Sequence, residues 1–430
     1  MQGNFKIILI IVFIVCAVIA IMVFAGVIPL GDKKVESTLT GNVVLWGTVK
    51  AGSLEPLVTQ FNFYNKSLKL IYVEKYAETF DQDLLEALAE GKGPDLFLLP
   101  DNLAYTYSNK IYTVPYASYP QLDFKNYFAG GTEVFLTNKG TLAFPLSIDP
   151  MVMYYNRSIL DANNIVYPPV YWDEFSEMSS KITKRDEANQ IVKSAVGFGQ
   201  YSNVTNAKDI VTSLFMQMGS PIVKQVGNAF LSNIGEKDES KRLGDALSFY
   251  TSFADPFNPS YSWNKSFPNS QDAFSSETLA FYFGYASELS TLIKKNPNQN
   301  MGVAPLPQIK NSNTKAAKAR IVGIAISSFS KNFNTAYGVA GLLSSGDFSR
   351  DFSRVLVLAP ARRDLLAQKQ QGLYLPTFYS SALISKSWLD PSPKDTEKIF
   401  RVMIESTLSN NVKAKDAVTD AGSRINLLLK

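Results

Sequence analysis

Residues 43–99 contain three short apolar runs, which read VVLW (43–46), LKLIYV (68–73) and DLFLL (95–99). Between them lie two segments with apolar residues at helical spacing, at 57–64 and from Thr79 to Gly91. This alternation of strands and helices predicts a parallel sheet with right-handed crossovers. Ligands of such sheets bind beyond the carboxyl ends of the strands, so we expect the residues that follow each run to line a site.

The rest of the chain continues this α/β pattern. We expect further strands at 142–146, 301–306 and 321–327, and helices at 151–160, from Pro393 onward and at 414–429. The length of 430 residues exceeds what one compact core accommodates, and it suits two α/β lobes.

The composition excludes several kinds of chemistry. The chain has no histidine, and its only cysteine is Cys16. Catalytic triads with histidine, zinc sites of His or Cys ligands and an internal disulfide are therefore ruled out, and we expect no cofactor. The net charge of +4 arises from 42 basic and 38 acidic residues, which gives no reason to expect nucleic-acid binding. A basic cluster at residues 310–320 is interpreted as a solvated loop.

An uncharged apolar segment, residues 7–28, occupies the amino terminus. As a helix it would span about 33 Å, enough to cross a bilayer, and Lys6 before it favours a body on the outer side. We expect a retained single-pass anchor in the cell membrane, followed by a polar linker at 29–40. The alternatives are a lipoprotein signal at Cys16, with a poorly matching residue before it, and signal-peptide cleavage after Ala25. All three interpretations place the body outside the cytoplasm.

Four motifs resemble the extracellular solute-binding proteins of the maltose-binding type (family 1), the substrate-binding components of ABC importers. They occur in the family's order and read GPDLFLLPD (93–101), FPLSID with YYNR (144–157), PPVYWDEF (168–175) and AFSSETLA (273–280). The resemblance covers nearly all of the body from Gly41 onward. It has three departures, because Tyr171 stands in place of a usual threonine, Glu277 in place of glycine and Arg157 in place of lysine.

The resemblance implies a two-lobed α/β fold of the periplasmic-binding-protein type (type II), with a hinged cleft. It implies a lobe I at 41–148 and 307–355 and a lobe II at 149–306 and 356–430, with passages between the lobes near Asp149, Leu306 and Val355. It further implies a binding protein without enzymatic activity, which captures a small solute and delivers it to an ABC permease. We expect it to act as a monomer.

The candidate ligand contacts are two carboxylates and five aromatic side chains: Asp101, Asp149, Trp46, Tyr154, Trp263, Tyr282 and Tyr285. Asp101 follows the third apolar run, and Asp149 lies at the first passage between the lobes, so each is placed to accept hydrogen bonds from ligand hydroxyls. The structural alternatives are a turn cap for the first and a hinge hydrogen bond for the second.

The alternative role is core packing for Trp46 and surface packing for Trp263, and of Tyr154 and its neighbour Tyr155 one ring is expected to face the core. Trp46 ends the first run, Trp263 lies in a polar aromatic loop, and Tyr154 is expected on the first helix of lobe II. Tyr282 and Tyr285 match the family segment that supplies an aromatic platform. Flat rings beneath carboxylates suit a sugar, whose faces are apolar and whose edges are polar, so we favour a carbohydrate ligand.

Two other functions are compatible with the sequence. The first is an extracellular carbohydrate-active enzyme that uses Asp101 and Asp149 as a carboxylate pair. The second is a sensor or adhesion domain that retains the binding fold.

Overall fold

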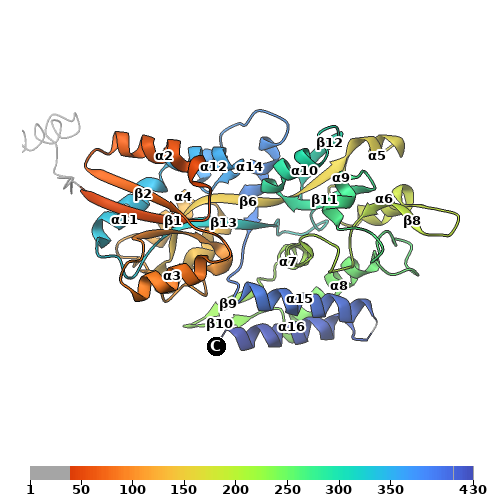
Figure 1. Ribbon diagram of the computed structural model, residues 1–430. Coiled ribbons are helices and arrows are strands. Elements are labelled where there is room, and N and C mark those ends of the chain that lie inside the picture. Colours follow the sequence, from red (N-terminus) through yellow and green to blue (C-terminus); the bar gives the residue numbers. More distant parts are fainter. Residues whose placement is uncertain (1–38, 410, 430) are drawn as a thin grey trace, which may run out of the picture.

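The computed structural model describes residues 39–409 and 411–429, which form two α/β lobes lying side by side (Figure 1). The predicted membrane span at 7–28 lies outside the described residues, as does most of the linker. Within the described part of the chain, no helix has the length and the apolar composition that crossing a bilayer requires.

Lobe I is built on a parallel sheet of the three predicted strands, β1 (Gly41–Gly47), β2 (Leu68–Glu74) and β3 (Leu96–Pro100), in the order β2-β1-β3. Helix α3 (Phe80–Ala89) packs on one face, and α2 (Ala51–Tyr64), α11 (Phe333–Leu343) and α12 (Gly346–Leu356) pack on the other. The parallel sheet predicted from residues 43–99 is therefore confirmed. The smaller elements of this lobe are α4 (Gln121–Tyr127), β4 (Leu136–Thr137), β5 (Gly140–Thr141), β14 (Ala359–Pro360) and α13 (Arg363–Leu366).

Lobe II has a separate apolar core that is rich in aromatic rings. Trp172, Phe175, Phe198 and Phe283 pack against one another with ring centroids 5.0–6.1 Å apart. Its elements are α5 (Arg157–Ala162), α6 (Glu174–Ile182), β7 (Lys184–Arg185), β8 (Ile191–Val196), α7 (Ala207–Gln217), β9 (Val223–Val226), β10 (Ala229–Ser232), α8 (Lys237–Ser252), α9 (Ser270–Ser275), β11 (Leu279–Tyr285), α10 (Leu289–Lys295), β12 (Met301–Pro305), α15 (Pro393–Leu408) and α16 (Ala414–Leu428).

Two long strands, β6 (Ala143–Asn156) and β13 (Ala317–Ile326), carry the chain between the lobes. The first half of β6 pairs with β13 in lobe I, and its second half pairs with β11 and β12 in lobe II. The predicted helix at 151–160 is therefore wrong for most of its length. Residues 151–155 are apolar and are hydrogen-bonded on both edges, which a strand allows, and the helix begins only at Arg157, capped by Asn156.

We place the second and third passages later in the chain than the sequence suggested. Residues after Leu306, up to Ala317, still pack in the core of lobe II, and β13 then enters lobe I. Residues after Val355, up to Leu366, still pack in the core of lobe I. The third passage runs through α14 (Leu375–Leu383) and β15 (Ser385–Lys386), whose flanking side chains pack in both cores.

Two of the departures from the family pattern have a local explanation. Glu277 has a φ of 60°, in the left-handed region where glycine is favoured, and its carboxylate accepts hydrogen bonds from Asn156 and Asn296. At Tyr171, which replaces a capping threonine, the carboxylate of Glu174 accepts from the backbone N–H of Val170 at 2.7 Å and of Tyr171 at 3.2 Å. The carboxylate of Glu174, the first residue of α6, thus accepts hydrogen bonds from backbone N–H groups that precede the helix.

A close contact between two glycines fixes α16 against lobe II. A Cβ atom added to Gly422 would lie 2.3 Å from the Cα atom of Gly235, whereas one added to Gly341, also within a helix, would meet nothing within 4 Å. We expect Gly422→Ala to lower the free energy of unfolding by about 1–3 kcal/mol, because the backbones must separate. Gly341→Ala is the matched control and should raise it by about 0.5–1 kcal/mol. Urea denaturation measures both, and equal effects would contradict the assigned contact.

Candidate functional site

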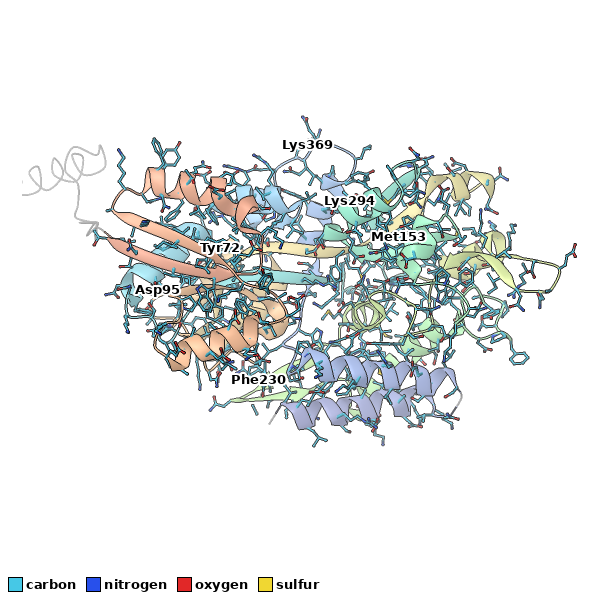
Figure 2. All side chains as sticks on the ribbon, viewed as in Figure 1. Tyr72, Asp95, Met153, Phe230, Lys294 and Lys369 are labelled. Carbon is cyan, nitrogen blue, oxygen red and sulfur yellow. The ribbon has the colours of Figure 1, made fainter. Side chains whose placement is uncertain are left out.

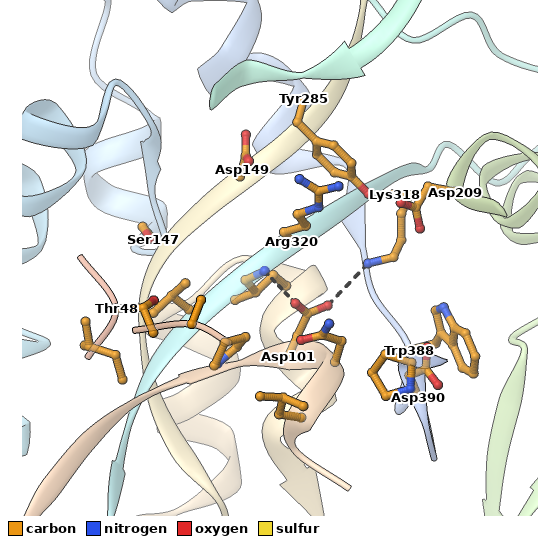
Figure 3. Close-up of a pocket in the computed structure, with 18 of the residues that line it drawn as sticks. Thr48, Asp101, Ser147, Asp149, Asp209, Tyr285, Lys318, Arg320, Trp388 and Asp390 are labelled. Atoms are coloured by element: carbon orange, nitrogen blue, oxygen red, sulfur yellow. Dashed lines mark hydrogen bonds and ion pairs between the residues drawn. The ribbon is translucent and has the colours of Figure 1, made fainter. Parts of the chain in front are cut away.

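A cleft of about 580 Å³ lies between the lobes, where the paired strands β6 and β13 pass from one lobe to the other (Figure 3). Besides the crossing strands, its walls come from five segments that are far apart in sequence. Lobe I contributes the segments after β1 and β3, lobe II contributes the first turn of α7 and the end of β11, and the third passage contributes residues near 388–390. The segments after β1 and β3 lie where the sequence predicted a site, beyond the carboxyl ends of parallel strands.

Asp101 lies in the cleft wall, but its carboxylate is already occupied. One oxygen accepts a hydrogen bond from the backbone N–H of Ile321 at 2.9 Å. The other accepts from the ammonium group of Lys318 at 3.3 Å and from the hydroxyl of Ser387. Only 3% of its side chain is exposed. Asp101 therefore joins the end of β3 to β13 and to the third passage. This role differs from the helix or turn cap that was its structural alternative, because its partners are distant in sequence.

Asp149 occupies the centre of the crossing, on β6 directly opposite Arg320 of β13. Its carboxylate accepts hydrogen bonds from the backbone N–H of Ser287 at 2.9 Å and from the Ser287 hydroxyl at 2.6 Å. Burial raises the pKa of Asp149 to about 6, and the bonds from Ser287 and the charge of Arg320 oppose this rise. The side chain lines the cleft and links the crossing strand to lobe II.

Tyr285 also lines the cleft, but Arg320 covers its ring. The guanidinium carbon of Arg320 lies 3.7 Å from the ring centroid, a close cation–π contact. Burial is the main cause that holds the pKa of Tyr285 well above its ordinary value, and the negative charge of Asp209 is the next largest. Figure 3 shows Tyr285, Arg320 and Asp209 converging on one part of the cleft. Arg320 itself remains exposed there and donates to the side-chain oxygen of Asn206 at 3.3 Å.

The other four predicted contacts do not line the cleft. Trp46 packs in the core of lobe I, with the ammonium of Lys75 4.0 Å from its ring centroid. Three more lie in the core of lobe II and point their polar atoms at internal partners: Tyr154 at the backbone oxygen of Tyr285, Trp263 at Asn203, and Tyr282 at Glu288. All four therefore pack in the cores, as the alternative for Trp46 had it, whereas Trp263 is buried and not packed at the surface as its alternative stated.

Sequence reasoning missed several charged residues of the cleft. Lys318 and Arg320 were assigned to a solvated loop, yet both lie on β13 and line the cleft. The signal was present, because AKAR at 317–320 alternates small apolar with basic residues at the spacing of a strand. No comparable pattern marks Asp209, in the first turn of α7, or Trp388, in the third passage.

A buried ion pair holds the lobe II side of the cleft to the third passage. The ammonium of Lys208 lies 2.7 Å from the carboxylate of Asp390 and 2.7 Å from the hydroxyl of Thr396, and 5.4 Å from the ring centroid of Trp388. Of the charged groups in the cleft, Lys208 and Lys318 are thus paired with carboxylates. Among the described residues, Arg320, Asp209 and Glu397 line the cleft without an ion-pair partner, so their charges remain for a ligand.

A hairpin of lobe II touches lobe I at one edge of the cleft. It consists of β9 and β10, joined at Gly227, which accepts a hydrogen bond from the side chain of Asn138 at 3.3 Å. Phe230 of the hairpin, labelled in Figure 2, packs edge-on against Tyr105 with ring centroids 6.0 Å apart. The lobes are therefore connected at this edge by side-chain contacts as well as by the crossing strands.

Comparisons with known proteins agree with this architecture. The family described as bacterial extracellular solute-binding protein matches residues 56–371. A cyclic α-maltosyl-1,6-maltose binding protein from Arthrobacter globiformis is similar over 91% of this chain and 99% of its own, with a TM-score of 0.74 and 14% identity. A sugar-binding protein from Xanthomonas citri has a TM-score of 0.72 and 17% identity, over 90% and 97% of the two chains. A cyclo/maltodextrin-binding protein complexed with maltotetraose has a TM-score of 0.70 and 15% identity, over 89% and 96%. At such identities these structures establish the two-lobed fold.

The raised pKa of Asp149 predicts a pH-dependent stability. Because the native pKa of about 6 lies above the unfolded value of 3.8, the protonated carboxyl stabilises the fold at low pH. That contribution, about 3 kcal/mol, is lost as the pH rises through 6. We expect Asp149→Asn, which stays neutral, to melt above the parent protein at about pH 8 and to lose this advantage by about pH 4. Melting curves across this range test it, and a difference independent of pH would contradict the assignment.

The pairing of Asp101 predicts that its loss affects stability directly. Asp101→Ala leaves the buried ammonium of Lys318 without its carboxylate and should lower the free energy of unfolding by about 3–5 kcal/mol. Adding Lys318→Met should recover part of this loss, because no unpaired charge then remains. Denaturation of Asp101→Ala, Lys318→Met and the double variant gives the interaction free energy between the two residues. If the two changes in the free energy of unfolding simply add, the ion pair contributes nothing to stability.

Proposed function

The chain belongs to the family of bacterial extracellular solute-binding proteins, and we propose that it captures a carbohydrate in the interlobe cleft and delivers it to the permease of an ABC importer. The observation that carries this proposal is the composition of the cleft. Thr48 and Asn102 of lobe I face Asp209 and Tyr285 of lobe II, across the exposed guanidinium of Arg320 on the crossing strand.

These side chains suit a ligand that both donates and accepts hydrogen bonds. The guanidinium of Arg320 only donates, the carboxylate of Asp209 only accepts, and the hydroxyl of Thr48 does both. Sugar hydroxyls match such a mixture, because each is donor and acceptor at once. The structurally similar proteins named above bind a cyclic maltosaccharide, a sugar and maltotetraose, which supports the same ligand class.

Ligand binding should close the cleft. A ligand that touches Thr48 and Asp209 together contacts both lobes, and only such contacts favour a closed state over an open one. Asp149 and Tyr285 contribute to this site from the crossing and from lobe II. Closure then presents the loaded protein to its permease in a distinct shape.

We favour capture over catalysis because of the state of Asp101. A glycosidase needs one carboxyl group that protonates the leaving oxygen and a second carboxylate that acts as base or nucleophile. The carboxylate of Asp101 accepts from Lys318, Ser387 and the N–H of Ile321, which together use three of its roughly four lone-pair sites. Asp101 is therefore poorly placed to act as one member of a catalytic carboxylate pair.

We further propose that residues 7–28 are retained as a membrane anchor and that a monomeric body lies outside the cell. The support is the uncharged length of this segment, the basic residue before it and the extracellular nature of the family. The linker at 29–40 then separates the body from the bilayer.

The binding site is tested by a thermal-shift screen followed by calorimetry. We expect saccharides to raise the melting temperature more than amino acids or peptides do. For the saccharide found, Arg320→Ala and Asp209→Ala should each weaken binding by about 10–100-fold, because each removes a charged hydrogen-bond partner. X-ray scattering should show a smaller radius of gyration with ligand.

Phe257→Ala is the control, because Phe257 is exposed on lobe II and does not line the cleft. It should leave the affinity unchanged. Stabilisation by amino acids or peptides alone would contradict the carbohydrate part of the proposal. Unchanged affinity in both cleft variants would contradict the site.

A further inference from the structure

The end of lobe I opposite the cleft carries a group of exposed aromatic and basic side chains, which we name the tip: Phe63, Tyr64, Lys66, Lys69, Phe329 and Lys331. The topology brings them together. Strands β1, β2 and β3 end at the cleft, so their starting points lie at the far end, with the turn between α2 and β2. Strand β13 is antiparallel to β3, so the connection from β13 to α11 lies at this end as well.

Three aromatic side chains of the tip are exposed. Phe63 is 67% exposed, Tyr64 72% and Phe329 55%. The rings of Phe63 and Tyr64 contact each other edge to face, with centroids 5.3 Å apart, at the end of α2. Tyrosine concentrates at the interface between water and a bilayer, where its apolar ring and its hydroxyl are both satisfied, and phenylalanine inserts its apolar ring there.

The basic side chains of the tip are free to act on a partner. Lys66, Lys69 and Lys331 are exposed, and within the described residues none of them has a carboxylate at ion-pair distance. The neighbouring acidic residues are paired. Glu90 pairs with Lys92 at 3.1 Å, and Asp347 and Asp351, which line a groove with Tyr64, pair with Arg350 at 3.0 and 3.1 Å. The three lysines of the tip therefore carry charge that these carboxylates do not neutralise, and this charge complements an anionic surface.

The described chain begins at the tip. The backbone oxygen of Thr40 accepts a hydrogen bond from the hydroxyl of Thr335, near the start of α11. The N–H of Gly41 donates to the backbone oxygen of Ser67, in the turn that follows Tyr64. Between the predicted span and the first described residue lie residues 29–38, which reach at most about 35 Å when fully extended.

We propose that the tip rests on the anionic lipid surface of the membrane that holds the anchor, an inference that depends on the proposed retention of residues 7–28. A short tether keeps the tip near the bilayer at an effective concentration in the millimolar range, so weak contacts suffice. Each lysine near an anionic leaflet strengthens binding by about five-fold. Because the cleft lies at the opposite ends of the same strands, this contact directs the cleft away from the membrane.

The body alone tests the surface. Residues 39–430 contain all described strands and helices and the apolar cores of both lobes, so this part folds without the anchor. We would measure its co-sedimentation with vesicles of phosphatidylcholine, with and without a third of phosphatidylglycerol. We expect stronger binding to the anionic vesicles. Lys66→Gln, Lys69→Gln and Lys331→Gln together should weaken it by about 100-fold on anionic vesicles.

The aromatic residues and a matched control complete the test. Phe63→Ser with Tyr64→Ser should weaken binding to both kinds of vesicle, because burial of the rings does not depend on lipid charge. Phe257→Ser with Lys265→Gln makes one substitution of each kind on an exposed part of lobe II and should leave binding unchanged. All variants should keep the rise in melting temperature that the ligand causes.

Three results would overturn the proposal. They are equal binding to both kinds of vesicle, an equal loss in the control variant, and concentration-dependent dimers of the body that the tip variants abolish, which would assign the tip to a second copy of the chain. The mass of the mature protein tests the tether separately. If the mature protein lacks residues 7–28, the tip is not held at the membrane, even if the isolated tip binds lipid. The proposal that the cleft captures a ligand would not be affected by that result.

Discussion

The pairing of β6 with β13 is the constraint from which the architecture follows. Each strand belongs to both lobes, and each is hydrogen-bonded along its length, so the lobes share one continuous sheet. The cleft lies at the crossing, where Asp149 of one strand stands opposite Arg320 of the other. A ligand bound there contacts the hinge itself, and binding energy acts directly on the part of the molecule that must bend.

Buried ion pairs hold the segments around the crossing strands in fixed positions relative to one another. Asp101 binds three donors from two connections, and Lys208 binds Asp390 beneath the cleft. Buried ions of this kind contribute little net stability but are costly to leave unpaired, so they restrict the arrangements that the connections can adopt. Arg320, by contrast, has only an amide and an aromatic ring as close partners. Within the described residues its charge is not neutralised by an ion pair.

Local patterns in the sequence predicted the parallel sheet of lobe I, the helix that begins at Pro393 and the last helix, because each is determined by the spacing of apolar residues within a short segment. They failed for β6, whose second half is a strand only because β11 and β12 pair with it from distant positions. The ligand contacts were predicted only in part, because their positions also depend on residues that are distant in sequence. An aromatic ring serves equally as core or platform, and only the assembled fold buries Trp263 on Phe267 while leaving Tyr285 at the cleft.

The hairpin of β9 and β10 connects the lobes at a second place, apart from the crossing strands, through its contacts with Tyr105 and Asn138. Moving the lobes apart at the hairpin would break the contact between Phe230 and Tyr105, an aromatic pair of a kind worth about 0.5–1.5 kcal/mol. The lobes are thus joined both by continuous chain and by a contact that can form and break.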